Sequence, residues 1–427
     1  MEKRLYPPLG ETVLWDRLPN GLTIAVVPRP GFTKKLCYFV TNFGAVDTKF
    51  LLDGQAHTVP AGVAHFLEHK LFDMPQRDVA AEFAALGAVP NAFTGYDMTA
   101  YHFSCTEHFE QCLDLLLEFV STPYFTAQSV EKEQGIIGQE IDMNADTPDI
   151  RLFEQLMESM YRQHPVREPI LGTRESVAQI TAEILHLCHR AFYRPDNMIL
   201  CVVGDVDPEQ VKNIAAARIS AAAGGKTRAQ RCWQEEMTCP IPFAAQDMEV
   251  SMPMFQLGFK CAPVDRGLET ARREIIGDLA AEVLFGESSE LYLRLYEQGL
   301  IDSSFGGGFE TVEGMAMLTA SGDSDDPEAV RDAILEEVGR LLQQGIGETA
   351  LLRMKRSALG RRIRDLDSFD STCFRICAYY FTGFDYFEFP DVYRDVTQDD
   401  LLLFLRENVT PERMSLSVIE PAKEEVQ

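Results

Sequence analysis

The sequence of 427 residues lacks the features that would place it in a membrane or outside the cell. No uninterrupted apolar run reaches the roughly 18 residues that a membrane-spanning helix requires. The first eight residues, Met1-Glu-Lys-Arg-Leu-Tyr-Pro-Pro, contain no apolar segment of the kind found in secretory signals. The ten cysteines include no Cys-x-x-Cys pair, which favours free, mostly buried thiols over a zinc knuckle or a disulfide framework. We therefore expect a soluble cytoplasmic protein.

Basic charge is also scarce. The chain has 39 Lys and Arg against 66 Asp and Glu, a formal net charge of -27. Nucleic-acid-binding proteins carry basic stripes, so this class is excluded, and an acidic surface would repel anionic membranes. The charge would tolerate cationic partners, and it is equally compatible with a role in solubility alone. The length predicts two domains or one large bilobed unit.

The most informative pattern lies at residues 62–72, with the sequence Gly62-Val-Ala-His65-Phe-Leu-Glu68-His69-Lys-Leu-Phe72. Its apolar residues recur at helical rather than alternating spacing, and they occupy most of the helix surface, so we expect a largely buried helix. His65, Glu68 and His69 fall at i, i+3 and i+4 on one face. Polar groups inside a protein are costly unless they have partners. A divalent metal is a partner that two imidazoles and a carboxylate can share.

A second helix is predicted at residues 128–143, where Val130, Ile137 and Ile141 form an apolar stripe. Glu133 and Glu140 fall on the same stripe, two turns apart. A solvated helix normally carries its acids on the opposite face. Two glutamates on the buried side therefore indicate that they have a partner.

Together these residues predict a catalytic zinc site. Zinc takes nitrogen and oxygen ligands, and a catalytic site has three protein ligands and one open position. His65 and His69 are one turn apart and can reach the same ion, and Glu140 is the best third ligand. Zinc lowers the pKa of a water in the open position towards about 7, and Glu68 would accept its proton as general base. Glu133 is expected to orient a histidine or the water.

Three other interpretations of the cluster stay open. His65 and His69 are compatible with core histidines satisfied by a salt-bridged glutamate. A non-catalytic zinc site is a second possibility, although structural zinc prefers closed sites of thiolates or imidazoles. The third is a soluble two-domain protein whose histidines are accidental. The remaining six histidines are assigned no role.

The second half of the chain repeats the predicted order of elements in the first half. Tyr101 aligns with Met317, and Met198 with Met414, and both pairs are 216 residues apart. This agreement predicts an internal duplication of an α+β unit. The positions of the polar cluster are occupied in the second half by different residues: Ala281, Leu284, Phe285 and Arg356. Only the first half is therefore expected to bind a metal.

We expect an α+β protein made of two homologous α/β-sandwich domains, each an antiparallel-rich mixed sheet with helices packed on it. The domains are predicted at residues 1–222 and 242–427. A small, polar and weakly periodic segment at residues 223–241 is the predicted linker.

The pattern His65-x-x-Glu68-His69, followed by Glu133 and Glu140, resembles the inverted zinc motif of the pitrilysin/insulinase family of metallopeptidases. Residues 18–22, 91–94, 170–176, 193–197 and 203–205 also look like landmarks of that family. The length is similar to that of its small, processing-peptidase-like branch, and in detail to a bacterial subgroup. The resemblance implies a clamshell in which two lobes, or two chains, enclose the substrate. It also implies a homodimer or a heterodimer with a related chain.

The resemblance implies substrate-binding residues as well. One set matches the edge strand to which a peptide adds as a further strand: Asn91, Ala92 and Phe93. Active members carry an arginine and, seven residues on, a tyrosine. Here Arg294 is followed at that distance by Ile301. Either Arg294 and Tyr296 act in an altered register, or a partner chain supplies the pair, or the activity is weak. Ordinary residues of an amphipathic helix are an equally good interpretation of both.

The sequence thus predicts a zinc-dependent endopeptidase that binds one Zn²⁺ per chain and hydrolyses peptides or unfolded segments, with no nucleic-acid or membrane partner. The alternative is a peptide-binding or scaffolding subunit of a peptidase complex with little activity of its own. The missing tyrosine favours the alternative, and the intact metal cluster opposes it.

Overall fold

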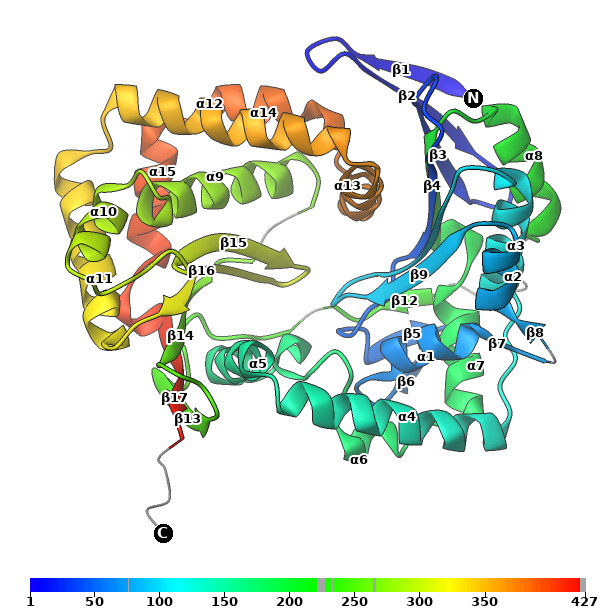
Figure 1. Ribbon diagram of the computed structural model, residues 1–427, viewed down its shortest axis with the longest axis horizontal. Coiled ribbons are helices and arrows are strands. Elements are labelled where there is room, and N and C mark those ends of the chain that lie inside the picture. Colours follow the sequence, from blue (N-terminus) through cyan, green and yellow to red (C-terminus); the bar gives the residue numbers. More distant parts are fainter. Residues whose placement is uncertain (76, 221–226, 232, 264–265, 423–427) are drawn as a thin grey trace. The chain divides into compact units, whose positions relative to one another are not determined.

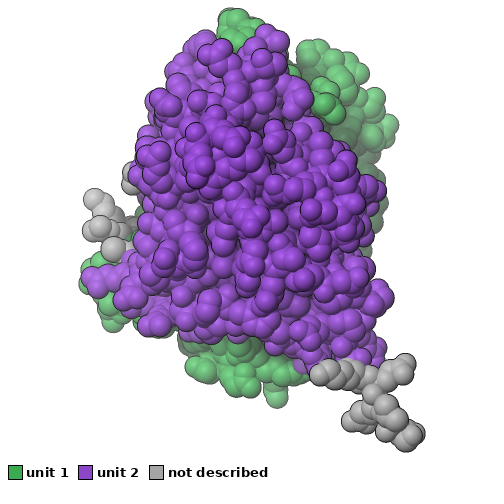
Figure 2. All heavy atoms as spheres, turned by 90° about the vertical axis from the view of Figure 1, so that its left-hand side faces the viewer, with its two compact units in different colours: residues 1–141, 169–231, 363–388 green, residues 142–168, 232–362, 389–427 purple. Residues whose placement is uncertain are grey.

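The computed structural model describes residues 1–75, 77–220, 227–231, 233–263 and 266–422 (Figure 1). The chain forms two compact units, each assembled from three separate segments (Figure 2). Unit 1 consists of residues 1–141, 169–231 and 363–388, and unit 2 consists of residues 142–168, 232–362 and 389–427. Among the described residues, no helix is both long enough and apolar enough to span a membrane.

These units differ from the contiguous ranges 1–222 and 242–427 that the sequence predicts. The difference arises because each unit contains one helix from the other half of the chain. The predicted linker at residues 223–241 lies partly outside the described residues.

Unit 1 is built on a seven-stranded sheet with the order β1-β2-β3-β11-β4-β10-β9. Its strands are β1 (Glu2–Tyr6), β2 (Glu11–Arg17), β3 (Thr23–Pro28), β4 (Lys35–Thr41), β9 (Val89–Thr94), β10 (Thr99–Cys105) and β11 (Met198–Gly204). All seven residues of β11 are buried at the centre of the sheet, which agrees with their continuous apolar run. A small second sheet contains β12 (Thr227–Ala229), β5 (Lys49–Leu52) and β6 (Gln55–Thr58), and a short ribbon pairs β7 (Asp73–Met74) with β8 (Arg77–Asp78).

Helices cover both faces of the large sheet of unit 1. One face packs against α1 (Val63–Leu71), α2 (Val79–Ala85) and α3 (Phe109–Ser121). Further helices on this side are α4 (Ala127–Ala145), α6 (Arg174–Val177), α7 (Ala182–Phe192) and α8 (Pro208–Arg218). The other face packs against α13 (Phe369–Thr382), which comes from the last part of the chain and lies along β4 and β11 (Figure 1).

Unit 2 repeats the core of unit 1. Its sheet has the order β13-β17-β14-β16-β15, with strands β13 (Phe243–Met248), β14 (Met254–Cys261), β15 (Gly306–Val312), β16 (Met315–Asp323) and β17 (Met414–Pro421). The directions of pairing match those of β3-β11-β4-β10-β9, including the single parallel pair at one end. The first residues of β10 and β16, and of β11 and β17, are 216 residues apart. The predicted duplication and α+β fold are thus confirmed.

The helices of unit 2 complete the repeat. They are α5 (Pro148–Met160), α9 (Leu268–Phe285), α10 (Glu290–Glu297), α11 (Pro327–Gln344), α12 (Glu348–Arg364), α14 (Phe389–Asp395) and α15 (Gln398–Asn408). Helix α9 lies against β15 and β16, as α1 lies against β9 and β10. Phe285, which aligns with His69, packs on β15 at Gly307, where an added Cβ atom would lie 2.3 Å from its ring. Apolar packing therefore replaces the polar cluster in unit 2.

Each sheet depends on a helix from the opposite half of the sequence. Helix α5 packs on β14 and β17 of unit 2, where Leu156 and Met160 lie directly over Gly258. Helix α13 packs on β4 and β11 of unit 1, where the Cys373 thiol lies 3.9 Å from the carbonyl oxygen of Cys201. The two helices hold equivalent places in the repeat, so the exchange between units is reciprocal. Neither half of the chain contains all the helices that cover its own sheet.

Ile376→Ala on α13 should destabilise unit 1, and Leu156→Ala on α5 should destabilise unit 2. The two side chains are 2% and 0% exposed, and removing buried methyl groups of this size typically costs about 2–5 kcal/mol. Hydrogen exchange measured by mass spectrometry should therefore quicken in β4 and β11 for the first variant. For the second variant it should quicken in β14 and β17.

Phe374→Ala is the matched control for α13, because its side chain is 38% exposed and its loss should cost less. Faster exchange in β14 and β17 alone after Ile376→Ala would contradict the exchanged arrangement.

Candidate metal centre

Helix α1 places three ionisable groups on one buried face. Eight of its nine residues are buried, as the sequence predicts, including His65 at 7% exposure and Glu68 at 9%. Its apolar side chains join the core of unit 1: Val63, Ala64, Phe66, Leu67 and Leu71. The packing of this apolar surface fixes the helix against β9 and β10 (Figure 1). It therefore also fixes the direction in which His65, Glu68 and His69 point.

The start of α1 is held by the segment at residues 169–180. Gly62 caps the helix with a positive φ of 86°, and a Cβ atom there would lie 2.3 Å from the carbonyl oxygen of Leu171. Only glycine meets both requirements. Ser176 Oγ donates a hydrogen bond to the Ala61 carbonyl oxygen at 2.9 Å, immediately before the helix. The sequence identified residues 170–176 as a family landmark, and the structure shows that they fix the beginning of α1.

The same segment holds α4. Gln134 on α4 donates from its amide nitrogen to the carbonyl oxygen of Ile180 at 3.0 Å. Arg174 lies over Gly138, where a Cβ atom would come within 2.7 Å of the guanidinium. Because the same segment contacts both helices, it fixes the position of α4, with Glu133 and Glu140, relative to α1.

His65, His69 and Glu140 form the one group of three metal-binding side chains among the described residues. Their ligand atoms all lie within 4.8 Å of one another. Nε2 of His65 is 3.7 Å from Oε1 of Glu140, and Nε2 of His69 is 3.7 Å from Oε2. These separations are too long for hydrogen bonds. Ligands of a tetrahedral zinc ion, with bonds of about 2.0–2.1 Å, lie about 3.3 Å apart. The residues therefore fit a zinc ion.

Metal ligation needs a neutral imidazole, and the two histidines differ in this respect. Burial, with a smaller contribution from the charge of His69, lowers the pKa of His65 to about 3, so that His65 is neutral. His65 Nδ1 is buried and has no hydrogen-bond partner among the described residues. His69 Nδ1 lies 3.1 Å from Glu133 Oε1. Burial opposes the charged form of His69, but this hydrogen bond and the nearby carboxylates outweigh it and raise its pKa.

The Glu133 carboxylate thus stands in the position expected of a group that orients a ligand. A hydrogen bond at His69 Nδ1 fixes the proton there and leaves Nε2 free to face Glu140. The side chain of Glu133 is 13% exposed, but that of Glu140 is 39% exposed. Both glutamates are therefore partly buried, Glu133 more than Glu140, on the stripe predicted for α4.

Glu68 lies on the same face of α1 but outside the group of three. Thr94, at the end of β9, donates from its hydroxyl to Glu68 Oε2 at 2.6 Å. Burial raises the pKa of Glu68, while the hydrogen bond from Thr94 and the charge of His69 act in the opposite direction. One carboxylate oxygen is thus held by Thr94, and the other has no hydrogen-bond partner among the described residues.

The predicted substrate strand is β9, an edge strand of the large sheet. Gly95 N–H bonds to the Met98 carbonyl oxygen, and ladder bonds alternate along an antiparallel pair. The backbone groups of Pro90, Ala92 and Thr94 therefore face away from β10, towards the edge with no neighbouring strand in the described sheet. The N–H of Ala92 on this edge is bonded by the side chain of the preceding residue, since Asn91 Oδ1 lies 2.9 Å away.

Phe93 lies on the face of β9 opposite to Thr94. Its ring is 5.9 Å from that of Phe374 on α13 and 6.3 Å from that of Tyr38 on β4. The edge strand therefore has a polar side at Thr94, near the metal ligands, and an aromatic side beneath α13.

Arg294 and Tyr296 belong to unit 2, on α10. Arg294 Nη1 lies 3.7 Å from Glu337, a buried carboxylate that also accepts a 2.6 Å bond from Arg340. Tyr296 is 54% exposed, and its ring stacks on Tyr292 at 6.0 Å. The role of both residues in substrate binding stays a prediction.

Sequence reasoning missed three parts of this site. Thr94 is the last residue of the landmark at 91–94, but its contact with Glu68 has no signal in the spacing. Lys70 on α1 is fully buried and pairs with Asp73, although its type predicts exposure. The third part is the holding segment at residues 169–180. The contacts of Thr94 and of the holding segment join elements whose pairing the sequence does not reveal, whereas Lys70 and Asp73 are only three residues apart.

Comparison with known proteins then relates this site to a family. A family profile described as Insulinase (Peptidase family M16) matches residues 55–174, and one described as Peptidase M16 inactive domain matches residues 179–358. The chain is 36% identical over 423 residues to a Bacillus subtilis protein described as an uncharacterized zinc protease, YmfH. The match covers 97% of this chain and 98% of that protein. The chain belongs to the M16 (insulinase) family of peptidases. The predicted family is confirmed.

Solved structures agree with this assignment. An M16-like peptidase from Alicyclobacillus acidocaldarius has a TM-score of 0.93 at 32% identity, covering 96% of this chain and 99% of that one. A protein described as a peptidase M16 inactive domain, from Pseudomonas fluorescens, shares the fold with a TM-score of 0.77 at 18% identity, covering 96% and 98% of the two chains. All five polar residues of the site, at positions 65, 68, 69, 133 and 140, lie within the range that the first profile matches.

Substitutions of Glu140 and Glu133 should weaken zinc binding to different extents. Glu140→Gln should weaken zinc binding by more than about 100-fold because it removes a ligand. Glu133→Gln should weaken binding by about 10–100-fold because it removes the group that orients His69. A competition titration against a chromophoric chelator measures both effects.

The matched control is Glu131→Gln, an exposed glutamate on the same helix, which should bind one zinc ion per chain with unchanged affinity. Equal zinc affinity in Glu140→Gln and Glu131→Gln would contradict the assignment of Glu140 as a ligand.

Proposed function

We propose that this M16 chain is a zinc-dependent endopeptidase that hydrolyses peptides or unfolded polypeptide segments. The convergence of Nε2 of His65 and Nε2 of His69 on the two oxygens of Glu140 is the observation that carries the proposal. Glu68 stands on the same helix face with one oxygen free of hydrogen bonds among the described residues. The zinc-protease name of the B. subtilis relative supports the same reaction class.

Each residue of the site would have a separate role in peptide hydrolysis. When bound, zinc polarises the peptide carbonyl and lowers the pKa of a water molecule. Glu68 accepts a proton from that water and returns it to the leaving amine. Thr94 holds the Glu68 carboxylate by its hydroxyl, so that the free oxygen keeps one orientation. Glu133 keeps the proton of His69 on Nδ1.

The free edge of β9 would bind the substrate as an added strand. Strand addition uses backbone groups alone and so accepts many sequences, provided that the segment is extended. An incoming peptide must take over the N–H of Ala92 from the Asn91 side chain. Unfolded segments can make this exchange, whereas most strands of a folded protein already have their backbone groups paired. The substrate class is therefore extended peptide.

Glu68→Gln should bind zinc and lose hydrolysis. The amide cannot accept a proton, and the contribution of a general base is about 10²–10⁴-fold in rate. Turnover of a quenched peptide library, together with metal analysis of the same sample, tests both parts, with Glu131→Gln as the control. Equal turnover by the wild type and Glu68→Gln would overturn the proposed mechanism.

Thr94→Val should lower kcat by about tenfold, because a hydrogen bond to a charged group contributes about 1.5–3 kcal/mol and 1.4 kcal/mol is tenfold in rate. Thr94→Ser keeps the hydroxyl and should retain most of the activity. Both variants should bind zinc normally, since Thr94 is not a ligand. If Thr94→Ser lost as much activity as Thr94→Val, the hydroxyl would not be the group that matters.

A second function is favoured by one observation. Arg294 shares the buried carboxylate of Glu337 with Arg340, and Ile301, 5% exposed, stands where family members carry a tyrosine. Because the chain lacks this tyrosine, it would be a peptide-binding subunit that needs a related chain for activity. Light scattering after size exclusion distinguishes a monomer from the homodimer or heterodimer that we propose. A metal-free protein that binds peptide without cleaving it would establish the second function.

A cytoplasmic location is also part of the proposal. The nine cysteines that the structure describes are free, and eight of them are buried, which suits a reducing compartment. Recovery of the protein in the extracellular fraction with oxidised cysteines would contradict it.

A further inference from the structure

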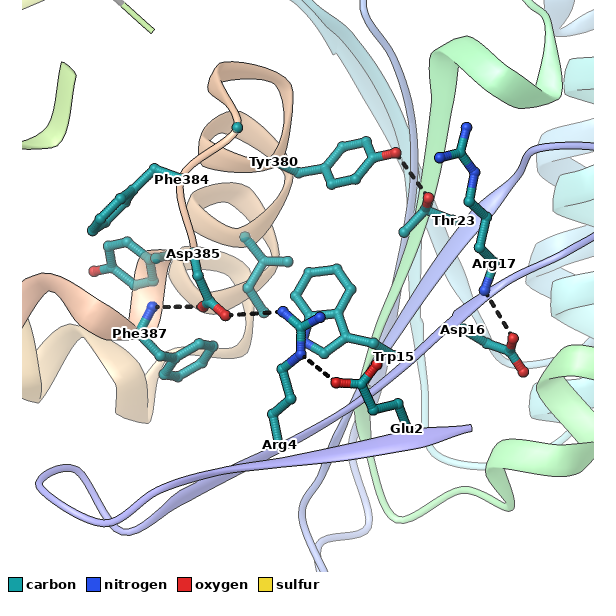
Figure 3. Close-up of a pocket in the computed structure, with 13 residues that line it drawn as sticks. Glu2, Arg4, Trp15, Asp16, Arg17, Thr23, Tyr380, Phe384, Asp385 and Phe387 are labelled. Carbon is teal, nitrogen blue, oxygen red and sulfur yellow. Dashed lines mark hydrogen bonds and ion pairs between the residues drawn. The ribbon is translucent and has the colours of Figure 1, made fainter. Parts of the chain in front are cut away.

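Unit 1 has a cavity far from the candidate metal centre along the sheet. It has a volume of about 640 Å³, within the range of small-molecule sites, and lies between the β1–β2 hairpin and the end of α13 (Figure 3). Helix α1 packs at the opposite edge, on β9 and β10. Five strand spacings of about 4.8 Å separate β2 from β9, or about 24 Å. A ligand in this cavity would therefore not touch the metal ligands.

Aromatic side chains form the walls of this cavity. Trp15 of β2 lines it together with Tyr380, Phe384 and Phe387, which come from α13 and the segment after it. Phe387 is fixed by stacking on Tyr6 at 4.9 Å. Rigid aromatic walls favour a flat, apolar group over an aliphatic chain, because ring pairs gain energy beyond the area they bury.

Each acid of the cavity already has a cationic partner, and one guanidinium is shared by two of the carboxylates. Arg4 lies 3.0 Å from Glu2 and 3.3 Å from Asp385, and its guanidinium sits 5.7 Å from the centre of the Trp15 ring. Asp16 lies 2.8 Å from Lys212, outside the cavity. None of the three carboxylates is therefore available to bind a cationic ligand.

One cation of the cavity has no such partner. The guanidinium of Arg17 makes no hydrogen bond or ion pair with any residue that the structure describes, and Figure 3 shows it beside Thr23. Thr23 and Tyr380 share one hydrogen bond of 2.8 Å between their hydroxyls. Because only one of the two hydroxyl hydrogens is used in that bond, the other remains available as a donor. A guanidinium and a hydroxyl donor together suit a carboxylate.

We propose that this cavity binds a carboxylate attached to an aromatic group. The carboxylate pairs with Arg17 and accepts from the Thr23–Tyr380 hydroxyl pair, and the ring lies against Trp15. A free aromatic acid and a peptide that ends in an aromatic residue share this chemistry. The site acts independently of metal binding and of peptide cleavage, so its test does not depend on the proposed peptidase activity.

Trp15 provides a direct readout, because the chain has only two tryptophans and the other, Trp233, belongs to unit 2. In the full-length Trp233→Phe protein, fluorescence then reports on Trp15 alone. N-acetylphenylalanine should change this fluorescence saturably at millimolar or lower concentration, and its amide should bind about tenfold more weakly or not at all. Calorimetry on the unmodified protein gives the same affinities without the substitution.

Arg17→Gln should weaken binding of the acid by about tenfold, and Tyr380→Phe by several-fold, with little effect on the amide. Lys3→Gln is the matched control, because Lys3 lies on the same hairpin but its side chain points to the opposite face from Glu2 and Arg4. It removes the same charge outside the cavity and should leave binding unchanged.

N-acetyl-Ala-Ala-Phe, with a free or an amidated end, distinguishes the two sources. Binding of the tripeptide acid as tight as that of N-acetylphenylalanine, or tighter, assigns the site to peptide ends. Binding of the single residue alone assigns it to small acids. Equal binding of acid and amide, an unchanged affinity in Arg17→Gln, or no saturable binding up to about 10 mM would overturn the proposal.

Discussion

The burial of α1 is the constraint on which the arrangement of unit 1 depends. An apolar helix surface holds His65, Glu68 and Lys70 in the interior, with His69 partly exposed beside them, and buried polar groups need partners. The partners come from other elements: Thr94 of β9 for Glu68, Glu133 of α4 for His69, and Asp73 of β7 for Lys70. Strand β9 and helix α4 must therefore approach α1 from different sides. The segment at residues 169–180 contacts both α1 and α4 and holds that approach. The arrangement of the site thus follows from the partners that the polar groups of a buried helix need.

The second half of the chain shows that the same fold forms without the polar residues of the candidate metal centre. Helix α9 occupies against β15 and β16 the place that α1 occupies against β9 and β10, with apolar side chains where α1 carries its polar ones. Phe285 fills the space over Gly307, a position that any larger residue would obstruct. Such packing stabilises a sheet without a metal, and it needs no counterpart of Glu133 or Thr94. The first repeat therefore has both the fold and the polar site, whereas the second repeat has the fold with apolar packing in place of the site.

Local pattern explains why the elements and the grouping of His65, His69 and Glu140 could be predicted. Helical spacing places His65, Glu68 and His69 on one face by covalent geometry alone, and the apolar stripe of α4 places Glu133 and Glu140 within two turns of each other. The contact of Thr94 with Glu68 depends instead on how β9 lies over α1, and nothing in either segment records that pairing. The exchange of α5 and α13 was hidden for the same reason. Each is an ordinary amphipathic helix, and its sequence shows an apolar face but not which sheet will cover it. The sequence predicts contiguous domains, whereas packing between distant segments gives two units of three segments each.

Helix α13 contacts the sheet of unit 1 from the edge strand β9 to β3. Phe374 near its first turns contacts Phe93 on the edge strand β9, and Tyr380 near its last turn bonds to Thr23 on β3. Phe374 and Tyr380 are six residues apart, about 9 Å along the helix, whereas four strand spacings from β9 to β3 amount to about 19 Å. The two aromatic side chains therefore span the remaining distance. Because α13 comes from the second half of the chain, that half builds the aromatic side of the edge strand. It therefore contributes to unit 1 through packing.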